Sequence, residues 1–340
     1  MTTFSIAMCT YNGAKYLPEQ LESLLCLDPA PIELVVGDDG STDDTVAILN
    51  QFSSRSPFPV RITSNSRQLG YGENFIQAAS RCSGDWVAFC DQDDVWLPSK
   101  LGRCREAIES GPSDLGLIVH NAIIGDANLN PRGRMHWPKP GLYPRLTLPP
   151  DWLVYGFRQV VRRSLFDEIS PRNRCLSWIG VPDAHDGWIC LIAGVTGSVV
   201  VLDDPLAIYR RHEANTTEEF GFARRSILKR ARDKIRKSAE VYQRNSAVYA
   251  SIAECLSGLA SAQRKPERRD QFLAASGKVA KLSLVFAARA ATIEGRNLRE
   301  RLGSFWTLTR EGAYYADHGV FGTREAALDL LRVFLPYQSN

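Results

Sequence analysis

Several carboxylates follow directly on an apolar run near position 90. The run Trp86–Cys90 has the composition of a buried strand, and Asp91, Asp93 and Asp94 come immediately after it. Mg²⁺ and Mn²⁺ prefer oxygen ligands, so such a cluster could hold a divalent cation. The same residues could instead form an acidic turn that caps the next helix, because Asp is a favoured N-cap residue. The other segments of the chain help to distinguish a cation site from a helix-capping turn.

Strand and helix signals alternate through the first 125 residues. Apolar runs predict strands at 4–9, 32–37, 60–63, 86–90 and 117–120, with helices at 18–27, 44–52, 74–79 and 100–108 between them. Strands separated by helices imply right-handed βαβ units and a mostly parallel sheet. Ligands bind such sheets beyond the carboxyl ends of the strands. The polar strand ends at 10–12, 38–39 and 91–94 should therefore meet at one edge and form a site.

Composition narrows the class of protein. The 340 residues exceed the usual size of one domain, and 44% hydrophobic with 23% charged residues is ordinary for a globular protein. A net charge of +3 is too small to indicate a nucleic-acid binder. The eight cysteines show no metal-binding spacing and predict free thiols in a reducing cytoplasm. The N-terminus enters a strand-like run and no apolar stretch reaches about 18 residues, so neither a signal peptide nor a membrane span is expected.

The later part of the chain changes character. Residues 126–150 are rich in Pro, Gly and Arg and predict a long loop, whereas 198–202 predicts a further strand. From about residue 222 the chain reads as helical and basic, including 271–291 and 324–334, which could form a small bundle or an oligomer contact. Residues 224–237 hold eight basic residues and predict a basic amphipathic helix. That helix could contact an anionic membrane or pack on its own bundle.

Six motifs occur in order at 7–13, 36–43, 69–75, 91–96, 185–188 and 209–215. Together they resemble the family 2 glycosyltransferases, inverting enzymes with the nucleotide-sugar-binding fold called GT-A. The resemblance covers about residues 4–215. It implies an α/β GT-A domain at 1–220, with a nucleotide-binding half to about 125 and an acceptor-binding half from 126. A basic, mainly helical region would follow at 221–340.

The resemblance implies a donor site at the strand ends. Asp39 would accept a hydrogen bond from N3–H of uracil or thymine, although it could merely cap the next helix with Asp38. Gly70 would allow close approach of the nucleotide, and Asp91 would face the ribose. The donor-binding residues expected in full are Thr10, Tyr11, Asn12, Asp39, Gly70, Asn74, Asp91 and Gln92.

A divalent cation, Mg²⁺ or Mn²⁺, is the cofactor that the resemblance implies. Asp93 would ligate the ion that bridges the donor diphosphate, and His212 would be a further ligand or a hydrogen-bond donor unless it is structural. Asp94 would start the following helix, and Arg210 or Arg211 would contact phosphate or solvent.

Asp186 is the general base that the resemblance implies. Inversion needs a carboxylate that removes the acceptor hydroxyl's proton as its oxygen attacks the sugar. Asp183 is the rival base and His185 a weaker one, while Trp188 would line the sugar or belong to the core. Residues 156–157 match the acceptor loop of the family.

The residues of three motifs are most similar to those of the rhamnosyltransferase branch. These are 91–96, 185–188 and 209–215, the last departing from the common pattern at Glu213–Ala214. The branch implies dTDP-L-rhamnose as donor and a glycan or lipid-linked glycan as acceptor, in cell-surface polysaccharide synthesis. A UDP-hexose or UDP-N-acetylhexosamine transferase and a non-catalytic nucleotide- or glycan-binding scaffold stay open. A nucleotidyltransferase is disfavoured, because residues 10–17 lack a Gly-rich phosphate loop.

Overall fold

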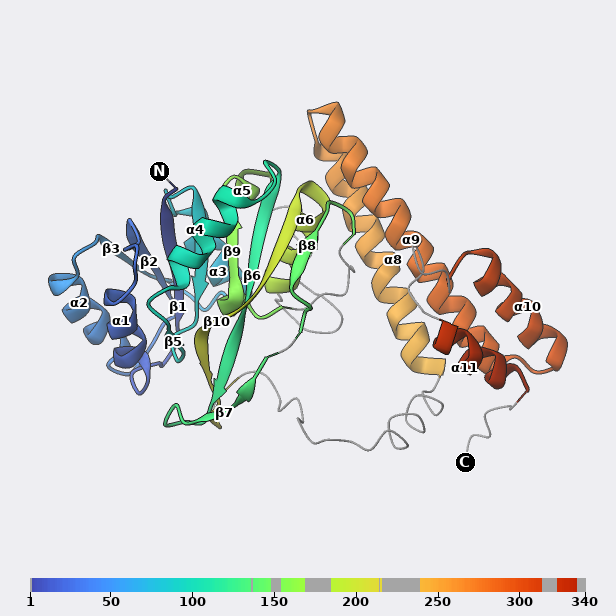
Figure 1. The fold of residues 1–340 in the computed structure, drawn as a ribbon, viewed down its shortest axis with the longest axis horizontal. Helices are drawn as coiled ribbons and strands as arrows, with labels where there is room; N and C mark the ends of the chain where they lie inside the picture. Colours follow the sequence, from blue (N-terminus) through green and yellow to red (C-terminus); the bar gives the residue numbers. More distant parts are fainter. Residues whose placement is uncertain are drawn as a thin grey trace. The chain divides into compact units, whose positions relative to one another are not determined.

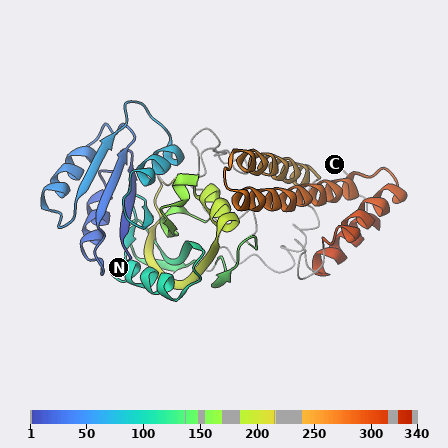
Figure 2. The same ribbon diagram turned by 90° about the horizontal axis from the view of Figure 1, so that it is seen from above.

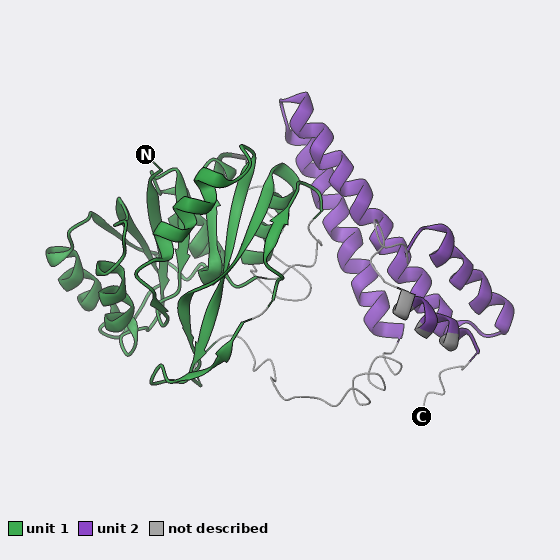
Figure 3. Ribbon diagram, viewed as in Figure 1, with its two compact units in different colours: residues 1–217 green, residues 218–340 purple. Residues whose placement is uncertain are grey.

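The computed structural model describes residues 2–135, 137–147, 154–168, 185–213, 215, 239–313 and 323–334. The chain divides into two compact units, residues 1–217 and 218–340 (Figure 3). The first unit carries a mixed sheet, and the described part of the second is helical.

One sheet runs through the first unit (Figure 1). Four of its neighbouring pairs, β3–β2, β2–β1, β1–β4 and β6–β10, are parallel, as the alternating signals predict. Strand β9 lies antiparallel between β4 and β6, and β5 is antiparallel to β10. The order across the sheet is β3 (Val60–Ser64), β2 (Glu33–Asp38), β1 (Phe4–Thr10), β4 (Trp86–Cys90), β9 (Gln159–Arg162), β6 (Leu115–Gly125), β10 (Ser198–Arg210) and β5 (Val95–Trp96).

Helices cover both faces of this sheet. Successive side chains of a strand point to opposite faces, so β4 places Ala88 in one core and Phe89 in another. The first core receives the apolar stripes of α1 (Leu17–Leu25), α2 (Thr45–Arg55) and α4 (Lys100–Ser110). On the other face Phe89 packs edge-on against Phe75 of α3 (Tyr71–Ser80), with ring centroids 5.7 Å apart, and against His185 of α6 (His185–Thr196) at 5.4 Å.

The elements predicted in the first 125 residues are all present, with ends shifted by a few residues. The long loop predicted at 126–150 is wrong in its described part, which holds β7 (Pro131–Arg134) and β8 (Gly141–Tyr143). These strands pair with β6 and β10, because those long strands offer unpaired backbone groups. Strand β10 also continues well past the predicted end at residue 202. A single turn, η1 (Gly156–Arg158), precedes β9, and the short helix α5 (Leu165–Glu168) follows it.

The described part of the second unit contains α8 (Ala239–Ala262), α9 (Pro266–Glu294), α10 (Leu298–Arg310) and α11 (Thr323–Phe334). Helices α8 and α9 lie side by side, as Figures 1 and 2 show, and Tyr249 of α8 stacks on Phe286 of α9 at 5.0 Å. A buried ion pair joins Arg289 of α9 to Asp329 of α11 at 2.6 Å. The segments 271–291 and 324–334 are helical as predicted, whereas 224–237 lies outside the described residues.

The described residues also bear on membrane-spanning helices and on the cysteines. None of the helices in these ranges is long and apolar enough to cross a membrane. The cysteines within these ranges are free thiols, and most of them are buried.

Candidate active site

The carboxyl ends of β1 and β2 meet in register. Thr10 is the partner of Asp38 across this pair of strands, and its Oγ1 donates to Asp38 Oδ1 at 2.9 Å. Asp38 also accepts from the backbone N–H of Ser41 at 3.0 Å, which closes the turn after β2. Asp38 therefore shapes the strand end, and it does not cap α2, whose N-cap residue is Asp44.

Asp39 faces the segment 65–70 across the same edge. Its Oδ1 accepts from Asn65 Nδ2 at 2.9 Å and from the N–H of Leu69 at 2.8 Å, and its Oδ2 accepts from the N–H of Gly70 at 3.0 Å. The side chain is 6% exposed. An ionised carboxylate has about four lone-pair sites, so these bonds leave capacity at Oδ2 for about one more donor. Asp39 thus organises this loop and does not cap the next helix.

Tyr11 and Gln92 connect the ends of β1 and β4. Gln92 Oε1 accepts from the N–H of Tyr11 at 2.9 Å, and its Nε2 donates to Tyr11 O at 3.1 Å. The Tyr11 ring is 47% exposed and free to contact a ligand. Asn12 has a positive φ of 47°, and its Oδ1 accepts from the N–H of Thr42 at 2.8 Å. Gln92 and Asn12 therefore hold the rim of the site together.

Gly70 and Asn74 shape the start of α3. Gly70 has φ 79°, a conformation that favours glycine. Asn74 is buried, donates to Gly37 O at 2.8 Å and accepts from Asn65 at 3.0 Å. A Cβ at Gly37 would lie 2.3 Å from Asn74 Oδ1, so the two residues fit closely. Asn74 acts as a brace beneath the edge.

Asp91 directly follows β4, and its carboxylate has no hydrogen bond among the described residues. Burial raises the pKa of Asp91 to about 7, and the carboxylates of Asp93 and Asp186 contribute to this shift. Because the charge of Asp186 contributes to the raised pKa of Asp91, Asp186 lies near the acidic strand end, although its helix is far along the chain. An unpartnered carboxyl group among like charges is the arrangement expected where a ligand or cation binds.

Asp93 lies against the end of β10. His212 Nε2 is 2.9 Å from Asp93 Oδ2, and Asn215 Nδ2 is 3.5 Å from the same oxygen. Arg210 donates from Nε to Asp93 O at 2.8 Å, and it also pairs with Glu19. The Arg210 side chain is only 2% exposed, so it braces the acidic loop and is neither a solvated nor a phosphate-facing arginine.

Asp94 does not start a helix, contrary to the prediction. It is fully buried between β4 and β5, and α4 begins at Lys100 after the N-cap residue Ser99. Asp94 Oδ1 accepts from the N–H of Arg210 at 3.1 Å, so it connects to the distant strand β10. Burial, with the charges of Asp93 and Asp91, raises the pKa of Asp94 well above its ordinary value.

Lys100 lies near the carboxylates of Asp91 and Asp94. The sequence alone did not indicate a role for it. Its side chain is fully buried, its Nζ donates to Phe157 O at 2.8 Å, and it lies 3.3 Å from the Trp96 ring centroid. Burial lowers the pKa of Lys100 to about 7. The ammonium group thereby links the start of α4 to the turn η1. Nothing in the polar sequence of α4 distinguishes this lysine from its solvated neighbours.

Asp186 occupies the first turn of α6. Its Oδ1 accepts from the N–H of Gly187 at 2.8 Å, and the buried Gln159 donates to its backbone carbonyl at 3.0 Å. Burial raises the pKa of Asp186 to about 6. A carboxyl group with a pKa near neutrality can accept a proton during a reaction at physiological pH. The rival Asp183 lies outside the described residues.

His185 and Trp188 belong to the core. His185 stacks on Phe75 at 4.4 Å, neither ring nitrogen has a partner in the described part of the chain, and burial lowers its pKa to about 3. Trp188 is fully buried, so it does not line a sugar site. Beside them the rings of Tyr155, Phe157 and Tyr209 stack, with Phe157 and Tyr209 5.1 Å apart.

The donors present suit a magnesium or manganese ion. Magnesium in phosphate-transfer sites takes one or two carboxylates and completes its shell with phosphate oxygens and water, at about 2.1 Å. Two adjacent ligands of such an octahedral ion lie about 3 Å apart, which is compatible with the 2.9 Å between Asp93 and His212. Within the described ranges no group of three or more His, Cys, Asp or Glu side chains is arranged around one ion position. The residues therefore fit a cation shared with a phosphate ligand.

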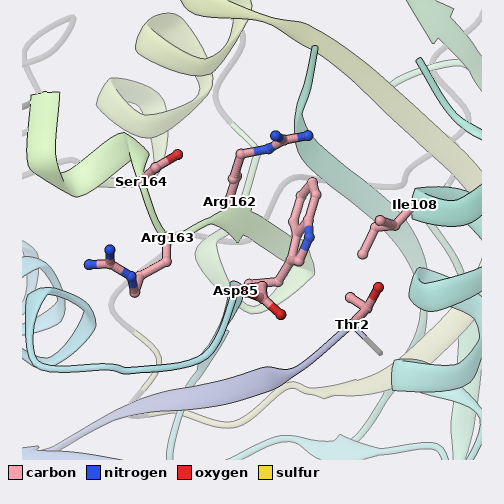
Figure 4. A pocket seen from close by; sticks show the side chains of 7 residues that line it. Thr2, Asp85, Ile108, Arg162, Arg163 and Ser164 are labelled. Carbon is pink, nitrogen blue, oxygen red and sulfur yellow. The ribbon is translucent and has the colours of Figure 1, made fainter. Parts of the chain in front are cut away.

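A separate pocket of about 530 Å³ opens at the opposite edge of the sheet (Figure 4). It is lined by Thr2, Asp85, Trp86, Ile108, Arg162, Arg163 and Ser164, and so lies where β1 and β4 begin. The carboxyl-end cluster is not part of it.

The mixed sheet, its two helical layers and the polar strand ends define the GT-A fold of nucleotide-sugar-binding proteins. The crystal structure of S. aureus TarS 1-349 is similar to this chain, with a TM-score of 0.52 and 18% identity over 92% of this chain and 93% of that one. Residues 5–170 match the family model described as Glycosyl transferase family 2.

Relatives of known sequence agree with this match. An uncharacterized glycosyltransferase of Nostoc sp. is 29% identical over 223 residues, which are 62% of this chain and 65% of the relative. The dTDP-rhamnosyl transferase RfbG of Shigella flexneri is 34% identical over 126 residues, 36% of this chain and 40% of the relative. The chain thus spans less than two thirds of the length of these relatives.

Proposed function

We propose that the protein is an inverting, metal-dependent glycosyltransferase that moves a sugar from a nucleoside diphosphate to a hydroxyl of a glycan. The observation that carries the proposal is the proximity of Asp186 to Asp91 and Asp93 at the carboxyl edge of a sheet whose first part, within residues 5–170, matches the family 2 model. A non-catalytic scaffold would not require a base with a raised pKa beside an acidic strand end.

The donor occupies the edge formed by β1, β2 and β4. Asp39 accepts N3–H of uracil or thymine with its remaining lone pair, and the exposed ring of Tyr11 lies against the base. The carboxylate of Asp91, which has no hydrogen-bond partner in the described ranges, accepts from the ribose hydroxyls. Thr10, Asn12, Gly70, Asn74 and Gln92 act chiefly by shaping this edge.

Asp93 and His212 would hold the divalent cation. When bound, the cation would supply positive charge that offsets the negative charge on the leaving diphosphate. The buried Arg210 keeps Asp93 in place through its backbone carbonyl. The acidic loop is therefore fixed before the donor arrives.

Asp186 removes the proton of the attacking hydroxyl in a single displacement. The acceptor oxygen bonds to the anomeric carbon as the bond to the diphosphate breaks, and the proton passes to the Asp186 carboxylate. Burial places the pKa of Asp186 at about 6, so the group is mostly ionised at neutral pH and is still basic enough to take a proton.

The preferred donor is dTDP-L-rhamnose, and the acceptor is a glycan or lipid-linked glycan of a cell-surface polysaccharide. Similarity to the Shigella dTDP-rhamnosyl transferase supports this choice over a short stretch. The alternative is a UDP-N-acetylhexosamine, supported by 33% identity over 128 residues to the S. aureus poly(ribitol-phosphate) β-N-acetylglucosaminyltransferase TarS. Action in the cytoplasm, with 224–237 on the inner face of the membrane, stays a hypothesis about residues outside the described ranges.

A panel of donors tests the proposal. Release of nucleoside diphosphate is measured for dTDP-rhamnose, UDP-glucose, UDP-N-acetylglucosamine and GDP-mannose, with Mg²⁺, with Mn²⁺ and with EDTA. We expect turnover of a dTDP- or UDP-sugar that EDTA abolishes and that Asp93→Asn lowers at least about 100-fold. Asp44→Asn is the matched control, because Asp44 is exposed and makes no capping bond. Turnover that is indifferent to EDTA would overturn the metal role, and equal loss in both variants would overturn the site.

A further inference from the structure

Helix α10 presents a second apolar face besides the one that it buries. Leu308 is fully buried and packs with Val285 and Ala313. Leu298, Leu302 and Trp306 recur every four residues and are 44%, 40% and 69% exposed. Residues spaced by four share one side of a helix, so these side chains form a continuous exposed stripe.

Arginines flank this stripe on both sides. Arg301 follows Leu298 by three residues and lies on one flank, where it is partly buried and donates to Gly295 O at 3.4 Å. Arg310 follows Trp306 by four and lies on the other flank, where it also pairs with Glu311 at 3.3 Å. Arg299 lies on the same flank as Arg310, and both are exposed. The acidic residue of the helix, Glu300, lies on the far side and is held by Asn297 Nδ2 at 2.9 Å.

The arginines beside the stripe favour an anionic partner over a second copy of the same face. A second copy of the same face would bring arginines against arginines, which is unfavourable. An anionic bilayer instead accepts leucine and tryptophan side chains below its headgroups and pairs the flanking arginines with lipid phosphates. Tryptophan is enriched at this depth in membranes. We infer that the stripe Leu298–Leu302–Trp306, with its flanking arginines, is a docking surface for an anionic lipid bilayer.

The inference goes beyond the proposed transfer reaction and does not depend on it. The test is sedimentation of the full chain with vesicles of phosphatidylcholine alone or mixed with phosphatidylglycerol. We expect binding to the anionic vesicles that falls with salt, and a partition coefficient lowered about tenfold or more in Leu302→Ser/Trp306→Ser. Leu273→Ser/Leu284→Ser on α9 is the matched control, because those leucines are 47% and 62% exposed. It should bind as the wild type does.

The other outcomes overturn the inference. If the α10 variant binds anionic vesicles as the wild type does, contact with lipid lies elsewhere, for example at 224–237. If the wild type does not bind, the face is no lipid surface. A loss of self-association in the α10 variant, measured by light scattering without vesicles, would assign the face to a second copy. Circular dichroism of each variant checks that it is folded, and no measurement requires turnover.

Discussion

The pH dependence of turnover tests the role of Asp186 most directly. Burial raises its pKa to about 6 from the 3.8 of an ordinary aspartate. A base must be ionised to act, so activity should fall as the pH drops through 6. About half of the Asp186 groups are ionised at pH 6 and about a tenth at pH 5, whereas an ordinary aspartate would still be almost fully ionised at pH 5.

The assay is kcat/KM for the acceptor between pH 5 and 8, with donor and metal saturating. Saturation matters because Asp91, whose pKa is raised to about 7 by burial and nearby carboxylates, lies on the donor side and would otherwise titrate in the same range. We expect kcat/KM to fall about tenfold from pH 8 to pH 5. Asp186→Asn should lower kcat/KM about 10²–10⁴-fold at pH 8, should remove the fall toward pH 5, and should leave donor affinity unchanged. A flat wild-type profile down to pH 5, or an Asn variant with more than about a tenth of the activity, would refute the assignment.

Three further predictions concern binding and stability. Asp39→Asn should weaken UDP binding at least about tenfold and shift the preference toward CDP, because an amide can donate to cytosine N3; equal weakening of both nucleotides in calorimetry would show that only the loop had changed. Lys100 has a folded pKa lowered to about 7 by burial, so between that pH and 10.5 the unfolded chain binds a proton that the folded chain lacks. The free energy of unfolding of the wild type, relative to that of Lys100→Met in urea denaturation, should therefore rise above pH 7 by at most about 1.4 kcal/mol per pH unit. A difference between the two proteins that does not change with pH would contradict this. Gly156→Ala would place a Cβ 2.7 Å from His185 Nε2, so it should cost about 1–3 kcal/mol in the same assay, and an unchanged midpoint would show that the ring can move.

Local patterns predicted most of the first unit. The period of apolar residues and the turn signals that follow them are short-range features, so β4 and the acidic loop after it could be placed from about ten residues. The shared edge followed from the rule that parallel strands present their carboxyl ends together. These predictions did not need any distant partner.

The errors concern residues whose partners lie far along the chain. Asp94 has the residue type of a helix cap, yet its partner is the N–H of Arg210, 116 residues later. Strand β9 enters the sheet between β4 and β6 only because residues 159–162 return there from beyond β6. Lys100 reads as a solvated residue, and its burial depends on the carbonyl of Phe157. Such contacts are set by tertiary packing, which single-sequence periodicity does not contain.

The pairing of Asp93 with His212 has a consequence for folding of the protein during its synthesis. The two residues are 119 positions apart. A ribosome adds about 5–20 residues per second, so the histidine is made roughly 6–24 s after the aspartate. During that interval the nascent acidic loop has neither its imidazole nor the backbone amide that later reaches Asp94. Folding of the first unit on the ribosome can therefore be completed only after β10 has left the exit tunnel.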